Sequence, residues 1–215
     1  MTDVSAVDIV RIETIVGRLR LLGGRLCLDF ANTAEYRGSD REFDLLVNYR
    51  VLVRWGVRAE VISPAEGERL LREVSAADAD AAFQRALTLR EAIYRIFAAC
   101  VRGAPIPTGE LAALNAALTT MIVHRKVELT ADGPDWDWHE WQSPDRVLGP
   151  VVLSAAELLT SADLDRVRQC PGCKWMFVDD SPKHNRVWCD MRICGNRAKV
   201  QRHYQRQKSQ RLVTG

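Results

Sequence analysis

Four cysteines near the C-terminal end of the sequence have the spacing of a metal site. Cys170 and Cys173 form a C-x2-C pair, and fifteen residues later Cys189 and Cys194 form a C-x4-C pair. Two close pairs joined by a loop of this length can place four sulfurs around one ion, as in structural zinc sites. Because four thiolates complete a tetrahedral shell, the predicted Zn²⁺ is single and structural, with no open position for a substrate.

The sequence allows two alternatives to a four-cysteine zinc site. The same cysteines could form two disulfides, but acidic residues occupy the opening of the chain where a secretory signal needs a basic region and an apolar run. We therefore expect a reducing compartment, the cytoplasm, in which thiols stay free for metal. His184 lies in the loop between the pairs and is an alternative ligand in place of one cysteine.

The residues after Cys194 predict a basic helix. Residues 195–211 lack proline and have a helix-forming composition. At about 100° per residue, Lys199, Arg202 and Arg206 gather on one side of that helix. We expect these three cations to face outward and to contact DNA phosphates.

The opposite side of this helix carries the apolar pair Val200 and Tyr204, with Arg197 beside them. We expect the pair to pack on the zinc module. Arg197 is expected to brace the thiolates, whose charge exceeds that of Zn²⁺, and it is also counted among the candidate DNA contacts.

Charge is divided unevenly along the chain. Residues 166–215 contain 12 Lys and Arg against 3 acidic residues, whereas residues 1–165 contain 18 against 25. A basic tail on an acidic body indicates a polyanion-binding segment, and nucleic acid is the commonest such partner. The alternative is a solvated surface helix without a partner.

Two motifs resemble a known family. The pattern WC-x4-CGNR-x-K, from Trp188 to Lys199, resembles the CGNR zinc finger, and GGRLCLDFANT, from Gly23 to Thr33, resembles the opening of the ABATE domain. In that family of bacterial stress-induced transcription regulators the finger follows the ABATE domain. The resemblance implies an ABATE-like domain over residues 1–165, which senses a ligand or dimerises, and a DNA-binding finger over residues 166–215.

The first 165 residues predict a mainly helical α+β domain with a small antiparallel sheet. Alternation of apolar residues predicts a strand from Leu26 to Phe30, while residues 1–22 permit helix or strand. An antiparallel pair is expected between residues 122 and 141, extending the same sheet. Helices are predicted over residues 42–56, from Ser63 through Val74, over 78–102, from Thr108 through Leu118, and over 146–160. We expect the cores of the two domains to be separate.

Polar and aromatic residues of the body form a candidate ligand pocket. Asp29, Asn32 and Arg37 could line its polar side, and the closely spaced Trp136 and Trp138, with Trp141, its aromatic wall. The alternative is that Asp29 and Asn32 tie down a turn through backbone hydrogen bonds, and that the tryptophans are core.

Several function classes are disfavoured by the sequence. No apolar run approaches the length that spans a bilayer, and neither a phosphate-binding loop nor a nucleophile–base motif occurs. We therefore predict a regulator that is not an enzyme, with DNA as partner, a small-molecule effector or a homodimer as further partners, and no membrane. The other two hypotheses are a zinc module that docks on the transcription machinery and an enzyme built around Asp29, Asn32 and Arg37.

Overall fold

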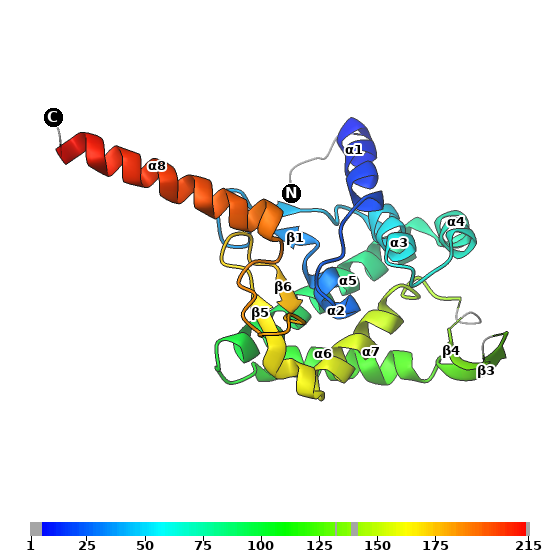
Figure 1. Ribbon diagram of the computed structural model, residues 1–215. Coiled ribbons are helices and arrows are strands. Elements are labelled where there is room, and N and C mark those ends of the chain that lie inside the picture. Colours follow the sequence, from blue (N-terminus) through cyan, green and yellow to red (C-terminus); the bar gives the residue numbers. More distant parts are fainter. Residues whose placement is uncertain (1–5, 132, 139–141, 214–215) are drawn as a thin grey trace.

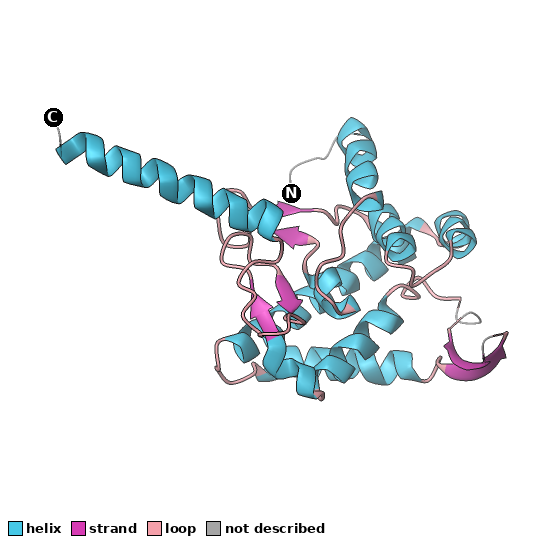
Figure 2. Ribbon diagram, viewed as in Figure 1, coloured by secondary structure: helices cyan, strands magenta, loops and turns pink. Residues whose placement is uncertain are grey.

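The computed structural model describes residues 6–131, 133–138 and 142–213 (Figure 1). This part of the chain is mainly helical with small two-stranded antiparallel sheets, which confirms the predicted α+β class (Figure 2). The helices are α1 Ala6–Gly17, α2 Leu26–Ala31, α3 Tyr49–Arg58, α4 Pro64–Glu73, α5 Ala76–Val101, α6 Thr108–Ile122, α7 Leu148–Leu159 and α8 Asn196–Val213. The paired strands are β1 Ala34–Glu35 with β2 Phe43–Asp44, β3 Lys126–Thr130 with β4 Gly133–Asp137, and β5 Val167–Gln169 with β6 Met176–Val178.

Side-chain caps mark the starts of α4 and α5. Ser63 accepts a hydrogen bond from the backbone N–H of Glu66, and the Glu66 carboxylate accepts one from the N–H of Ser63, so α4 begins with a full capping box. The Ser75 hydroxyl accepts the N–H of Asp78 at 3.2 Å and so caps α5. The helices predicted from Ser63, over 78–102, from Thr108 and over 146–160 are all present, with ends shifted by a few residues, and the last two begin without a side-chain cap.

The segment from Leu26 to Phe30 is a helix, and the predicted strand is wrong. Cys27 and Asp29 are buried together with Leu28 and Phe30, so α2 is surrounded by protein on nearly all sides. A short helix without a solvent face shows no helical periodicity in its sequence, and its alternating leucines resemble a half-buried strand.

Two further expectations are corrected. Residues 43 and 44 pair with β1, so the helix predicted over 42–56 begins only at Tyr49, where the Asn48 side chain accepts the N–H of Val51. The antiparallel pair β3–β4 exists, with Val127 opposite Trp136, but it forms a sheet of its own at one end of the molecule (Figure 1).

The hydrophobic core of the body continues into the zinc module. Helix α2 packs against α5 and α7 at its centre, and the same buried cluster includes Val167, Met176 and Val178 from β5 and β6. Phe177 is buried in a second cluster with the four cysteines. Because side chains alternate along a strand, β6 joins both clusters, and the expectation of separate cores is wrong. Within the described residues, the helices lack the combination of length and hydropathy that a membrane span requires.

Candidate metal centre and nucleic-acid interface

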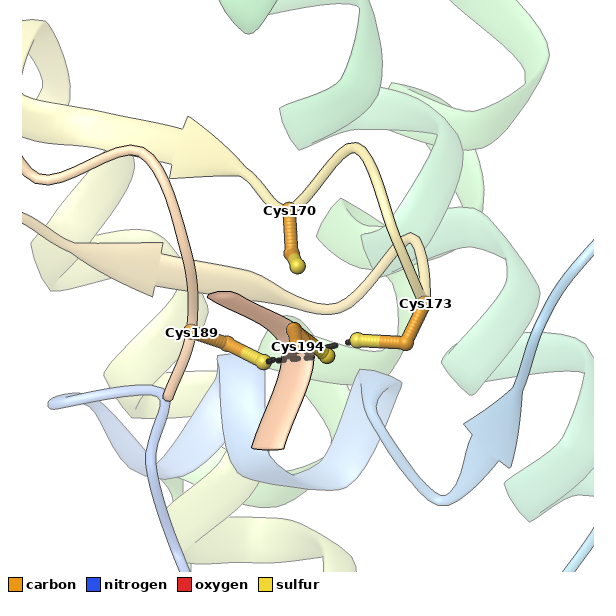
Figure 3. A group of neighbouring side chains, drawn as sticks. All are labelled: Cys170, Cys173, Cys189 and Cys194. Atoms are coloured by element: carbon orange, nitrogen blue, oxygen red, sulfur yellow. Dashed lines mark hydrogen bonds between the residues drawn. The ribbon is translucent and has the colours of Figure 1, made fainter. Parts of the chain in front are cut away.

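The four predicted cysteines converge on one point (Figure 3). Their sulfur atoms all lie within 4.8 Å of one another, and the four residues are buried. The Sγ atoms of Cys173 and Cys189 are 3.4 Å apart, and those of Cys189 and Cys194 are 3.7 Å apart. A tetrahedral Zn²⁺ with Zn–S bonds of about 2.3 Å requires sulfurs about 3.8 Å apart, so the donor set fits zinc. Disulfides need about 2.05 Å and are not formed.

Electrostatics of the cluster also call for a cation. Hydrogen bonds from neighbouring thiols lower the pKa of Cys170, whereas hydrogen bonds with Cys170 and Cys173, together with burial, raise the pKa of Cys189. Four buried sulfurs at this distance cannot all ionise unless a divalent cation offsets their charge. The cluster is therefore the site of a single structural zinc ion, as the spacing of the cysteines predicts.

The backbone around the first pair is shaped to aim its sulfurs. The N–H of Cys170 donates to the carbonyl of Trp175 at 2.8 Å, and the N–H of Lys174 donates to the carbonyl of Cys170 at 2.9 Å. Lys174 has a φ of +66°, which closes this tight turn. A Cβ at Gly172 would lie 3.4 Å from the Trp188 ring, so the turn packs closely on the second half of the module.

The second pair is held by a loop that ends in a helix start. Cys189 lies in the loop, and Cys194 lies in a π-helical turn, Met191–Gly195, that runs directly into α8. The N–H of Cys194 donates to the carbonyl of Asp190 at 2.9 Å. A Cβ at Gly195 would lie 2.3 Å from the Met191 sulfur, so any other residue there would require the half-exposed Met191 side chain to move. The fourth zinc ligand therefore fixes the direction in which α8 leaves the module.

Two residues that the sequence analysis missed organise the loop between the pairs. The buried carboxylate of Asp179 accepts the N–H of Ser181 at 3.0 Å and the N–H of Arg186 at 2.9 Å. The Arg186 guanidinium lies 4.3 Å over the Phe177 ring and donates to the carbonyl of Trp188 at 3.0 Å. The side chain of His184 lies close to the carbonyl of Asp179 instead of the sulfurs, so the alternative histidine ligand is not part of the cluster.

Four hydrogen bonds attach the module to the body, three of them from the ABATE-like motif and one from Tyr36 just after it. The Asn32 amide makes two buried hydrogen bonds with the backbone of Met176, one to its carbonyl and one from its N–H, both at 2.8 Å. The N–H of Val178 donates to the carbonyl of Gly23 at 2.9 Å, and the N–H of Tyr36 donates to the carbonyl of Cys173 at 3.1 Å. The motif is therefore the surface on which the zinc module is built.

Arg197 lies where it was expected, but it has a partner that the sequence did not indicate. Its guanidinium donates to the hydroxyl of Tyr36. This hydrogen bond raises the pKa of Arg197, and the nearby sulfurs of Cys194 and Cys173 raise it further. The arginine therefore joins α8 to the body beside the zinc site, and its role as a brace for the thiolates stays a prediction.

Helix α8 projects from the zinc module into solvent (Figure 1). Lys199 and Arg202 are exposed, as the predicted outward stripe requires, while the side chain of Arg206 lies outside the described ones. Val200 and Tyr204 are 46% and 66% exposed, so the expectation that they pack on the module is wrong. They line one side of a groove next to it instead.

The residues of the predicted ligand pocket have protein partners and lie on separate elements. Asp29 accepts the N–H of Gly23 at 2.8 Å, and Asn32 binds Met176, as the alternative interpretation of a tied turn expects. Arg37 forms an ion pair with Glu91 at 2.5 Å and lies 4.1 Å over the Tyr94 ring.

The tryptophans of the predicted aromatic wall lie elsewhere. Trp136 is 52% exposed on β4, far from α2, with Arg125 over its ring at 3.8 Å, whereas Trp138 is buried (Figure 1). Trp141 lies outside the described residues. The structure does not bring the two halves of the pocket together, and an effector site stays a prediction.

Comparison with protein families matches nearly the whole chain. The ABATE model, described as "Putative stress-induced transcription regulator", matches residues 24–162. The CGNR zinc finger model matches residues 166–207. A search of curated proteins finds no match.

Proposed function

Because the chain belongs to the ABATE family and carries a CGNR zinc finger, we propose that it binds duplex DNA through helix α8. The zinc ion is structural, and its role is to aim this helix. The observation that carries the proposal is a lone helix of 18 residues with six basic and no acidic residues, joined directly to the fourth zinc ligand.

The physical state of α8 argues for a polyanionic partner. Its described side chains from Lys199 to Gln205 are all exposed, so tertiary packing does little to stabilise this part of the helix. An isolated helix of this length is marginal in water, and its like charges repel one another. A helix about 27 Å long fits the major groove, where phosphates on both sides offset its charge.

The salt dependence of DNA binding tests the proposal. A duplex is first selected from random sequence with the zinc-loaded full chain. For Lys199→Ala/Arg202→Ala/Arg206→Ala, the slope of log K against log salt should flatten by about 2.7, or about 0.9 for each phosphate contact. Zinc content should not change, because α8 leaves the module before these residues.

The matched control removes the same charge from exposed arginines of the body. Arg50→Ala/Arg72→Ala/Arg102→Ala should leave the slope unchanged, since these positions lie on α3, α4 and the end of α5. If the α8 variant binds DNA as tightly as the parent at every salt concentration, the proposal is wrong. Zinc-dependent capture of a protein that is insensitive to salt would then favour the docking hypothesis.

We propose that residues 1–165 carry the regulation, through an effector or through dimerisation, and the description of the family that matches residues 24–162 as a transcription regulator supports this. What supports this is the attachment of the module: Asn32 and Tyr36 connect the body to the backbone of the zinc site. A change of shape in the body would therefore reach α8. Sedimentation of the zinc-loaded chain, with and without the selected duplex, distinguishes a monomeric regulator from a dimeric one.

A further inference from the structure

A groove of about 820 Å³ runs along one flank of α8. Its walls are the first turns of α8, the Pro171–Gly172 turn of the zinc module and one residue from the body. The polar and aromatic residues that line it are Arg41, Trp188, Arg197, Gln201, Tyr204 and Gln205. The described lining contains no carboxylate. The groove therefore combines two guanidinium groups with aromatic and amide side chains.

Arg41 is the contribution of the body to this groove. It is exposed, and its guanidinium lies 4.3 Å from the centre of the Tyr36 ring. Arg197 contacts the same tyrosine, through its hydroxyl and at 5.7 Å from the ring centre. Among the described residues no carboxylate is paired with Arg41, and the neighbouring Glu42 accepts the N–H of Gly38 at 2.8 Å. The positive charge of Arg41 is thus available to a ligand.

The loop that carries Arg41 is held in place from both ends. Tyr36 has a φ of +52°, a conformation that bulky residues rarely adopt, and its N–H donates to the carbonyl of Cys173. The Ser39 hydroxyl donates to the carbonyl of Tyr36 at 2.7 Å. A residue that is strained and still well bonded indicates a loop whose shape is set by its surroundings. The start of this loop is therefore fixed, and the Arg41 guanidinium stacks on the ring of the residue that fixes it, Tyr36.

We propose that this groove holds the sugar–phosphate backbone of one DNA strand and that Arg41 binds one of its phosphates. The proposal rests on the proposed function, since a helix in the major groove has a phosphate backbone along each flank. Guanidinium groups bind phosphate oxygens with two hydrogen bonds, and amide and tyrosine side chains commonly add further backbone contacts. The acidic body thereby supplies a DNA contact at the point where it meets the zinc module.

Salt titrations of a charge series at position 41 test this, with the zinc-loaded full chain and the duplex that the parent selects. Arg41→Ala should flatten the slope of log K against log salt by about 0.9. The ratio of variant to parent affinity should accordingly rise about 3.5-fold between 50 and 200 mM salt. Arg41→Lys keeps the charge and should keep the slope. Arg72→Ala, which removes an exposed arginine on α4, should change neither affinity nor slope.

The outcomes separate this inference from the proposed function. If the parent binds no duplex, the proposed function is wrong and this inference with it. If the α8 variant loses affinity but Arg41→Ala keeps the parent slope, the phosphate contact is refuted while DNA binding by α8 stands. An Arg41→Ala variant that binds weakly with an unchanged slope has the same meaning, because Arg41 would then act only by positioning Tyr36 and Arg197.

Discussion

The two halves of the zinc module are stabilised in opposite ways. The first half, from β5 through β6, buries Val167, Met176 and Val178 in the core of the body and shares two hydrogen bonds with Asn32, one donated by each partner. The second half continues as α8, whose described side chains from Lys199 to Gln205 are all exposed. The zinc ligands therefore join β5 and β6, which pack against the body, to α8, which is held mainly by its first turn.

This difference indicates that the two halves of the module have different roles. The strands β5 and β6, which share the core of the body, hold the orientation of the fourth zinc ligand, Cys194. Helix α8, which follows Cys194, is left exposed to a partner. The cost of leaving a charged helix exposed is offset only when a polyanion binds. Attachment and exposure are therefore both part of the proposed DNA-binding function.

Among the changes considered, zinc removal is expected to lower the stability of the protein most. Structural zinc contributes about 10 kcal/mol or more to folding in small zinc modules. Because Met176 and Val178 belong to the core of the body, loss of zinc should also lower the melting temperature of the body, by about 10 °C or more. Calorimetry of Cys189→Ser/Cys194→Ser, with zinc content measured in parallel, checks this.

The control for zinc removal is Cys100→Ser. Cys100 is a free thiol on α5 outside the cluster, so this change should leave zinc content intact and shift the melting temperature little. A body that melts at the parent temperature after complete zinc loss would mean that the two cores are independent.

Asn32→Ala should break the attachment without touching the metal ligands. It leaves the N–H and the carbonyl of Met176 buried without their partner, at about 1–3 kcal/mol for each group. We expect a loss of about 2–5 kcal/mol in the free energy of unfolding, measured by urea titration, and faster release of zinc to a chelator. Asn115→Ala, an exposed change on α6, should cost well under 1 kcal/mol. Equal effects of the two changes would contradict the role of Asn32.

A smaller change in the free energy of unfolding is expected from the titration of Asp29 on α2. Burial raises the pKa of this carboxyl from 3.8 to about 6, although the hydrogen bond from Gly23 opposes the shift. The folded state therefore binds the proton more tightly than the unfolded state, so stability from this group is present at low pH and is lost as the pH rises through about 6.

Between pH 5 and pH 7 the free energy of unfolding should fall by about 1 kcal/mol through Asp29 alone. The Asp29→Asn variant has no carboxyl to ionise at this position. The difference in free energy of unfolding between parent and variant therefore separates this contribution from the titration of the cysteines. Parallel pH profiles of the two proteins would show that the pKa of Asp29 is not raised.

What the sequence could predict depended on whether the decisive contacts were local. Each cysteine pair and the helix start at Ser63 are defined by neighbours a few residues apart, and both were predicted correctly. The role of Asn32 depends on Met176, which is 144 residues away, and no local pattern indicates that pairing.

The other differences between prediction and structure also depend on tertiary packing. Helix α2 lacks a polar face, so its sequence alternates like a strand. Tyr36 packs against the cysteine cluster, and only the tertiary structure places the nearby Arg41 in the groove beside α8. Val200 and Tyr204 were assigned to the module because apolar residues usually pack, whereas here they line that groove.

Hydrogen exchange of the zinc-loaded chain, with and without the selected duplex, measures whether α8 is exposed in the free protein and covered by DNA in the complex. In the free protein we predict that amides of α2 and β6 exchange slowly, while those of α8 beyond its first turn exchange nearly as fast as in an unfolded chain. Addition of the duplex should protect α8 strongly and change the core little. Protection of α8 that is already complete in the free protein, or duplex-induced protection confined to other elements, would contradict the account.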